Sequence, residues 1–221
     1  MDGNDGHKGI QESSDLDEVL PPLKVTCVSV DCDRNLHCFL KRRGMAPEAI
    51  GGCRACGAKL VDWDKLHRRD RTDVQATFEA LRHERIRHHM WHICFDDRAM
   101  TLARKRGKAN TYARIEGRLK SSIGKARGGF DGRQTSMEGN VIFYAQHATA
   151  TCCRKCLGYW HGIPTDIPLS HEQLDYCGHL VRSYLDERLE GLPEAPASKQ
   201  AKPRARRNGN RPAAGQHANG P

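Results

Sequence analysis

The segment His147-Ala-Thr-Ala-Thr-Cys152-Cys153-Arg-Lys-Cys156-Leu-Gly-Tyr-Trp-His161 places three cysteines and two histidines within fifteen residues. Cys153 and Cys156 have the two-residue spacing of a zinc knuckle, whereas Cys152 and Cys156 are about one helical turn apart. A short strand and a short helix can bring the histidines close to the thiols. We therefore predict a zinc site made of Cys152 or Cys153, Cys156, and one or both of His147 and His161.

Two other interpretations of these thiols are open. A Cys-x-x-Cys pair beside a base such as Arg154 or Lys155 is expected to have a lowered thiol pKa, which favours redox chemistry. Buried cysteines also occur simply as small apolar side chains in a core.

A second pair with knuckle spacing lies in the N-terminal half, in Cys53-Arg-Ala-Cys56-Gly57. Such a turn points two thiolates at one ion, and zinc then needs two more ligands from a distant segment. The available donors are His37, Cys38 and His67, with Cys32 in reserve. We predict a structural zinc here; the alternative is a pair of incidental buried thiols.

Composition supports a metal-organised core. Only 38% of the 221 residues are hydrophobic and 6% aromatic, so the apolar side chains available for a conventional interior are few. A structural zinc contributes on the order of 10 kcal/mol in small zinc peptides, which offsets such a shortage. The predicted fold is α+β, a small mixed domain organised by two Cys/His zinc sites, with disordered termini.

The compartment follows from what the sequence lacks. Its first twenty residues are acidic and have no cationic start or apolar core typical of a secretory signal. Every uncharged apolar stretch is shorter than the roughly 18 residues that span a bilayer. We expect a cytoplasmic protein that does not span a membrane, and in that reducing compartment clustered thiols favour metal over disulfides.

Charge and composition divide the chain into five predicted segments. Residues 1–22 form an acidic tail of net charge −5, and residues 192–221 form a basic tail of net charge +5; both are polar and predicted to be disordered. Between them we predict a zinc-knuckle region at 23–72, a basic helical segment at 73–117 and a Cys/His-rich domain at 118–191.

Local patterns predict the elements of the folded part. Alternation of apolar and polar residues favours a strand at 23–30, and the apolar run at 141–145 favours a buried strand. Helices are predicted at 74–93 and at 97–106, the second ending at Gly107. Residues 124–140 are glycine-rich and read as a loop. Ser170 and Gln173 form a capping box for a last helix that ends before Gly191.

The chain from about Arg118 to Leu189 resembles a bacterial and phage family catalogued as domain of unknown function 4186. The resemblance is carried by Asp131-Gly-Arg-Gln-Thr135, by the run from Gln146 to Leu157, and by Trp160-His-Gly-Ile-Pro164. Ser136 and Asn140 differ from a Pro and a His that the family commonly shows. The resemblance implies a small domain rich in cysteine and histidine, and it supplies no reaction.

The helix predicted at 74–93 carries a third cluster. Glu84, His88 and His92 are each four residues apart and share one helix face, so they are candidates for a catalytic metal site. The alternatives are structural packing, a shared zinc ligand, or an exposed basic face.

Residues 82–133 hold the whole positive excess, with fourteen Lys or Arg against five acids. Bases at this density can contact successive phosphates, which gives salt-dependent affinity for nucleic acid. A solvated positive face is the plainer alternative. The candidate nucleic-acid contacts are Arg82, Arg85, Arg87, Arg104, Lys105, Arg106, Lys108, Arg114 and Arg118.

These observations favour a zinc-binding protein that acts as a nucleic-acid-binding or DNA-associated accessory factor. A metal-dependent hydrolase such as a nuclease is the first alternative, with Glu84, Asp64 or Asp131 as the general base. A thiol redox protein that uses Cys152, Cys153 and Cys156 is the second. The sequence does not specify whether the chain is an enzyme, whether it prefers DNA or RNA, or its oligomeric state.

Overall fold

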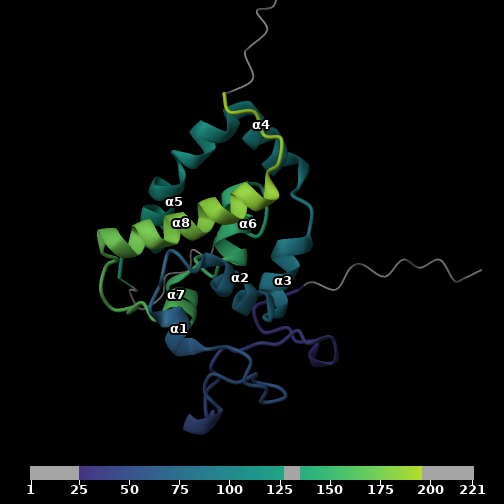
Figure 1. The fold of residues 1–221 in the computed structure, drawn as a ribbon, viewed down its shortest axis with the longest axis vertical. Coiled ribbons are helices and arrows are strands. Elements are labelled where there is room, and N and C mark those ends of the chain that lie inside the picture. The colour runs from purple at the N-terminus through teal and green to yellow at the C-terminus, as the bar shows by residue number, and fades with distance from the viewer. Residues whose placement is uncertain (1–24, 127–134, 196–221) are drawn as a thin grey trace, which may run out of the picture.

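The computed structural model describes residues 25–126 and 135–195, and in these ranges the protein is helical (Figure 1). The predicted α+β class is therefore wrong. Apart from the isolated bridges Asp31–Leu36 and His37–Glu84, the described residues contain no β structure. The α-helices are α1 (Trp63–His67), α2 (Val74–Arg82), α3 (Arg85–His92), α4 (Asp97–Tyr112), α5 (Ile115–Ile123), α6 (Val141–Ala148), α7 (Arg154–His161) and α8 (His171–Arg188).

The helices pack around α6 and α8. α6 lies between α3 and α8, α5 packs along α8, and α1 packs on α7. In Figure 1 the mostly non-helical segment 25–62 lies below α1 and α7, at the lower end of the molecule. None of the described helices is long and apolar enough to cross a membrane.

The buried strand predicted at 141–145 is instead the first part of α6. Asn140 caps this helix, because its Oδ1 accepts a hydrogen bond of 3.0 Å from the Ile142 N–H. Nearly every residue of α6 is buried, so the helix shows no polar face. A short apolar run that is covered on all sides has the same pattern in a strand and in a helix.

Of the strand predicted at 23–30, residues 25–30 are described and do not form a strand; residues 23 and 24 lie outside the described residues. Residues 25–30 form a turn in which the Ser29 N–H donates to the Thr26 carbonyl at 3.1 Å. Val28 lies on this turn and is 54% exposed. The alternation of residue types here belongs to a turn with no partner strand.

The single helix predicted at 74–93 is broken into α2 and α3 at His83 and Glu84. The break is filled by the backbone of His37: its N–H donates to the His83 carbonyl at 2.7 Å, and its carbonyl accepts from the Arg85 N–H at 2.9 Å. The two apolar stripes that the sequence shows in this stretch are thus the buried faces of two helices.

The helix predicted to end at Gly107 continues beyond it. Gly107 has φ 76° and ψ 170°, a conformation open to glycine, and α4 resumes on its far side. The N–H groups of Lys108 and Ala109, freed by this kink, donate to the carbonyls of Pro193 and Glu194 at 2.8 and 3.2 Å. Glycine therefore kinks this helix rather than ending it.

The last helix begins as predicted. Ser170 and Gln173 form the reciprocal capping box at the start of α8, which ends at Arg188. The predicted acidic tail at 1–22, the basic tail from 196 onward and the middle of the glycine-rich loop at 127–134 lie outside the described residues.

Candidate metal centres

Four donors from two segments meet in the N-terminal region: Cys32, His37, Cys53 and Cys56, which we call the knuckle cluster. Their ligand atoms all lie within 4.8 Å of one another. The Cys32 and Cys53 sulfurs are 3.8 Å apart, and the Cys56 sulfur lies 3.4 Å from Nδ1 of His37. Zinc held tetrahedrally, with Zn–S near 2.3 Å and Zn–N near 2.0 Å, needs separations of about 3.8 and about 3.5 Å. The four donors therefore fit a metal ion of this size.

The histidine of this cluster is oriented by a neighbour. Nε2 of His37 donates to Oδ1 of Asn35 at 2.9 Å, which leaves the Nδ1 lone pair directed at Cys56. Asn35 itself sits in the left-handed region at the end of the short 3-10 turn Cys32–Arg34. This turn thus places one sulfur and orients one imidazole.

The Cys53–Gly57 turn presents the other two thiols. The Gly57 N–H donates to the Cys53 carbonyl at 2.8 Å, and Gly57 has a positive φ of 79°. Burial raises the pKa of Cys53, but hydrogen bonds from nearby backbone groups, that of Cys56 first, lower this pKa to about 6. Burial and then the neighbouring thiols raise the pKa of Cys32 to about 12. A cation is needed before all these groups can be charged together.

Two predicted donors of the N-terminal site lie elsewhere. The thiol of Cys38 is buried and donates to the Cys27 carbonyl at 3.2 Å. Nε2 of His67 donates to the Tyr159 carbonyl at 3.1 Å, between α1 and α7. Cys32, which the sequence offered only as an additional donor, lies beside His37, Cys53 and Cys56 in the place expected for Cys38 or His67.

The second group of donors is Cys152, Cys153 and Cys156, which we call the thiol cluster. Their sulfurs lie within 4.8 Å of one another. Cys153 is the N-cap of α7, and its sulfur accepts from the Cys156 N–H at 3.5 Å. The neighbouring Cys152 thiol raises the pKa of Cys153 to about 11. All three cysteines face one point, so both members of the vicinal pair belong to the group.

The two histidines predicted for this site form hydrogen bonds with backbone carbonyls instead. Nε2 of His147 donates to the Thr135 carbonyl at 3.0 Å, and Nε2 of His161 donates to the Thr149 carbonyl at 2.9 Å. Nδ1 of His161 also lies 3.1 Å from the Tyr176 hydroxyl. Burial lowers the pKa of each imidazole to about 4. The structure does not group either imidazole with the three sulfurs.

An arginine stands beside the thiol cluster. Arg87 has no exposed surface, and its Nη2 donates to the Cys156 sulfur at 3.2 Å while Nη1 lies 3.8 Å from the Cys152 sulfur. Nε donates to Oε2 of Glu84 at 2.9 Å. Burial by itself lowers the pKa of Arg87, but Cys156, Glu84 and Cys152 raise it well above its ordinary value. Sequence reasoning placed this residue at a nucleic-acid surface.

The predicted catalytic group Glu84, His88 and His92 is divided between the core and the surface. Glu84 is fully buried, and its Oε2 also accepts from the indole N–H of Trp160 at 3.1 Å. The His88 and His92 rings lie together on the outer side of α3, with centroids 4.0 Å apart. Burial raises the pKa of Glu84, the Arg87 charge opposing it. The break before α3 is what turns the carboxylate away from the imidazoles.

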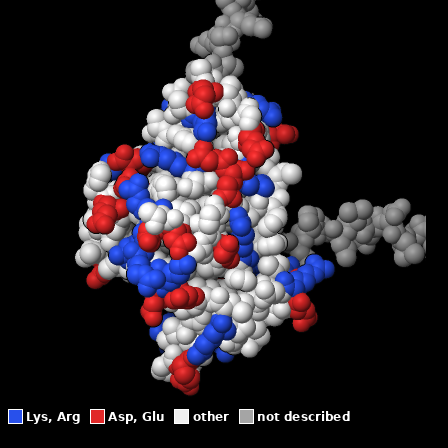
Figure 2. Space-filling model, viewed as in Figure 1, with Lys and Arg blue, Asp and Glu red and all other residues white. Residues whose placement is uncertain are grey.

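Most of the predicted nucleic-acid contacts already have a partner within the chain, several of them at the surface. Arg82 pairs with Glu187, Arg85 with Asp31 and Lys108 with Asp186, while Arg118 lies over the Phe143 ring. The face seen in Figure 2 accordingly shows lysines and arginines interspersed with acids. The number of lysines and arginines in this segment is therefore larger than the number of unpaired cations that could contact a polyanion.

Four cations gather along α4, at what we call the basic groove: Arg98, Lys105, Arg106 and Arg114. Two adjoining hollows share Lys105 and Arg106; one extends to Arg114 and the other to Arg98. Among the described residues none of the four is paired with a carboxylate. Arg104 is exposed on the same helix outside the lining.

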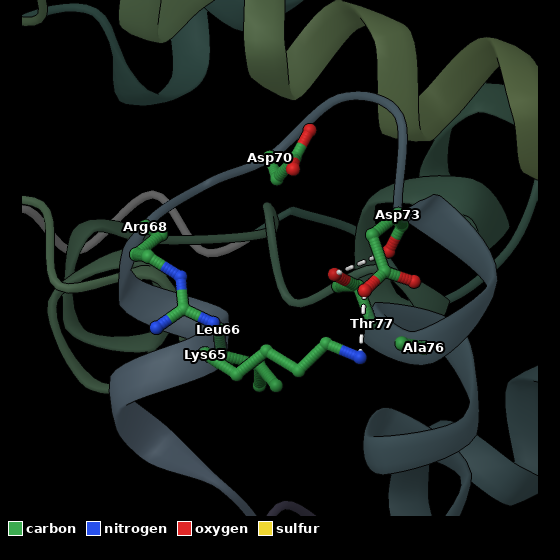
Figure 3. A pocket seen from close by; sticks show the side chains of 7 residues that line it. All are labelled: Lys65, Leu66, Arg68, Asp70, Asp73, Ala76 and Thr77. Carbon is green, nitrogen blue, oxygen red and sulfur yellow. Dashed lines mark hydrogen bonds and ion pairs between the residues drawn. The ribbon is translucent and has the colours of Figure 1, made fainter.

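A small hollow between α1 and α2 is drawn in Figure 3. An ion pair of 2.6 Å between Lys65 and Asp73 crosses it, and Thr77 lies behind this pair. The hydrogen bond with Asp73 raises the pKa of Lys65. Because Lys65 and Asp73 pair with each other, we assign no site to this hollow.

A family model described as Domain of unknown function (DUF4186) matches residues 75–186, which is half of the chain. The match includes the thiol cluster, Glu84 and Arg87, and it extends further toward the N-terminus than the resemblance read from the sequence. The knuckle cluster lies outside it, in a region without a family assignment. No solved structure matches the chain.

Proposed function

The chain belongs to the family described as Domain of unknown function (DUF4186), and we propose that this member is a zinc-binding protein that associates with nucleic acid. The family description assigns no reaction, so the proposal is supported by the donors themselves. The observation that carries it is the knuckle cluster, in which three sulfurs and one imidazole nitrogen lie within 4.8 Å of one another and two of their separations match those of tetrahedral zinc.

The donor set favours zinc among the biological metals. Thiolate ligands select zinc, cuprous ion or iron–sulfur clusters, and a tetrahedral set of sulfur with nitrogen is typical of zinc. Four protein ligands leave no position for a substrate, which is the pattern of a structural site. Zinc here would join the segment of Cys32 and His37 to the Cys53–Cys56 turn and stabilise a region with little regular helix.

We propose zinc for the thiol cluster as well, which gives two ions per chain. Three sulfurs converge there at the start of α7. Zinc would become the common centre of α7 and of the segment that links it to α6. Reduced thiols are required for both sites, so we place the protein in the cytoplasm.

Metal analysis of the purified protein tests the zinc assignment. Protein prepared without chelators is expected to hold close to two zinc ions per chain, and absorption spectroscopy at the zinc edge is expected to show mainly sulfur with a minority of nitrogen. A preparation that holds no zinc, and takes none up when reduced and supplied with it, contradicts the proposal.

The basic groove supports the nucleic-acid part of the proposal. Three of its cations lie on α4 and the fourth, Arg114, is the N-cap of α5; Asp97 also lines the groove, but the described residues show no ion pair between a carboxylate and these cations. Contacts of this kind bind phosphates without reading base sequence. Binding of a labelled duplex and of a single strand is expected to weaken steeply as salt increases. Failure to bind either at low salt contradicts this part alone.

A further inference from the structure

The thiol cluster differs from the knuckle cluster in having a buried cation against its sulfurs. Arg87 is fully enclosed, and two of its nitrogens face Cys156 and Cys152 at 3.2 and 3.8 Å. Buried arginine is rare unless it is paired, so the contacts that it makes indicate its role.

Two hydrogen bonds besides those to sulfur hold the guanidinium in place. Nε donates to Glu84 at 2.9 Å, and Nη1 donates to the His147 carbonyl at 2.6 Å. Glu84 is in turn fixed by the indole N–H of Trp160 at 3.1 Å. The donors left over on the outer edge of the fork are those that face the sulfurs. A planar fork with five N–H groups can make all these bonds at once, and an ammonium cannot.

The net charge of a metal bound at the three sulfurs indicates what the arginine would do there. Three thiolates around a divalent cation carry a net charge of −1, and an uncompensated charge in a protein interior is costly. Glu84 balances the unit charge of Arg87 but contacts only Nε, so what the arginine offers to the sulfurs is the N–H donors of its two terminal nitrogens. Hydrogen bonds from N–H to a metal-bound sulfur withdraw negative charge from it and stabilise the thiolate.

We propose that Arg87 is the positioning residue of a metal site formed by Cys152, Cys153 and Cys156, and that its hydrogen bonds to the sulfurs determine how tightly this site holds a thiophilic divalent cation. This inference rests on the proposed metal binding at the thiol cluster. In the knuckle cluster the outer-shell bonds run from His37 to Asn35 and from the Ala55 N–H to the Cys53 sulfur, and among the described residues no hydrogen bond joins this cluster to Arg87, so it serves as an internal reference.

Titration of reduced, metal-free full-length chain with Co²⁺ tests this inference, because cobalt bound to thiolate has a sulfur-to-metal charge-transfer band. The variants are Arg87→Lys and Arg87→Met. The control is Arg188→Met, since Arg188 lies on α8, outside both clusters, and donates to the Ile93 carbonyl at 2.7 Å rather than to sulfur.

The expected result separates the two sites. In both Arg87 variants one equivalent of Co²⁺ binds as in the wild type, while the affinity for the other falls by about ten-fold to a hundred-fold, as for other outer-shell changes. The charge-transfer band of the weakened site moves to longer wavelength, because its sulfurs have lost their hydrogen-bond donors. In Arg188→Met both affinities and the band are expected to equal those of the wild type.

Two outcomes overturn different statements. If the Arg87 variants bind two equivalents with wild-type affinity and spectrum, Arg87 is a packing residue and this inference is wrong. If the wild type takes up only one equivalent, and Cys153→Ser leaves that uptake unchanged, the thiol cluster holds no metal and the proposed second site itself is wrong. Arg87→Lys keeps the positive charge, so it provides the measurement if Arg87→Met does not fold.

Discussion

The carbonyl of His37 accepts a hydrogen bond of 2.9 Å from the N–H of Arg85. His37 belongs to the knuckle cluster, outside the family match, and Arg85 is the first residue of α3, inside it. A candidate metal ligand is thereby built into the break between two helices. Order in the knuckle cluster is therefore coupled to the packing of α2 and α3.

Loss of the knuckle metal is expected to destabilise the protein as a whole. Cys53→Ser should lower bound zinc by about one ion per chain. It should also lower the melting temperature by roughly 10 °C, because several kcal/mol of metal binding free energy is lost. Elemental analysis and thermal unfolding measure the two effects. The control is Cys94→Ser, since Cys94 is exposed and outside both clusters; equal losses in the two variants would contradict the site.

The buried pair Glu84–Arg87 is expected to be sensitive to the loss of one partner. Glu84→Ala leaves the guanidinium without its carboxylate, which costs about 3–5 kcal/mol for a buried pair. Denaturant unfolding measures this free energy. Glu116→Ala, which breaks the exposed pair with Lys120 on α5, should leave this free energy nearly unchanged, because exposed ion pairs contribute little. Comparable losses would mean that Glu84 is solvated.

The kink in α4 is expected to require glycine. Gly107→Ala should destabilise the protein by about 1–3 kcal/mol, because φ 76° with ψ 170° is closed to residues with a side chain. Gly117→Ala in α5 is the opposite case: its added methyl group meets no atom within 4 Å, and helix propensity should stabilise the protein by up to about 1 kcal/mol. Unfolding free energies of the two variants should thus differ in sign.

His161 is expected to make folding stability dependent on pH. Burial lowers its pKa to about 4 from the ordinary 6.5, so the unfolded chain binds the proton more readily than the folded one. Stability is complete above about pH 6.5 and is lost as the pH falls toward 4, by up to about 3 kcal/mol. In His161→Gln, which keeps a donor for the Thr149 carbonyl, the loss should be smaller by the share of His161, while the share of His147, whose pKa burial also lowers to about 4, remains. A parallel decline in both proteins would assign the effect to other groups.

The basic groove is expected to account for salt-dependent binding of nucleic acid. Replacing Lys105 and Arg106 by alanine should weaken binding and reduce the slope of log affinity against log salt by roughly 2. Alanine at the exposed pair Lys41 and Lys59 removes the same charge from the knuckle region and should leave the slope unchanged. If both double variants behave alike, the attraction is a property of net charge.

Cysteine spacing located both metal-site candidates in the sequence, because a Cys-x-x-Cys turn forms from local residues alone. The remaining ligands depend on long-range packing. Cys32 faces Cys53 only because the short turn at 32–34 directs it there, and spacing along the chain treats Cys32, Cys38 and His67 alike. The Asn35 amide beside His37 was the available signal, and a single sequence gives it little weight.

The errors in fold and surface have a common physical origin. Patterns reveal how strongly a residue is covered but not by what. The run at 141–145 is covered on every side, and it forms a helix that a strand pattern describes equally well. Arg87 was counted with its basic neighbours. Its spacing from Met90 and Trp91, three and four residues further along the chain, places it on the buried face of α3. There its hydrogen bonds to Glu84 and to the sulfurs account for the burial of a charged side chain.

The aromatic contacts of Trp160 cross the boundary of the family. Phe39 and Trp63, both outside the matched region, lie with ring centroids 5.8 and 5.1 Å from that indole, and together they leave it fully covered. The N-terminal region of this chain therefore serves as a lid that the shared domain does not encode. A chain cut back to the matched residues 75–186 would lose both of these rings, so its Trp160 indole is expected to become exposed to solvent.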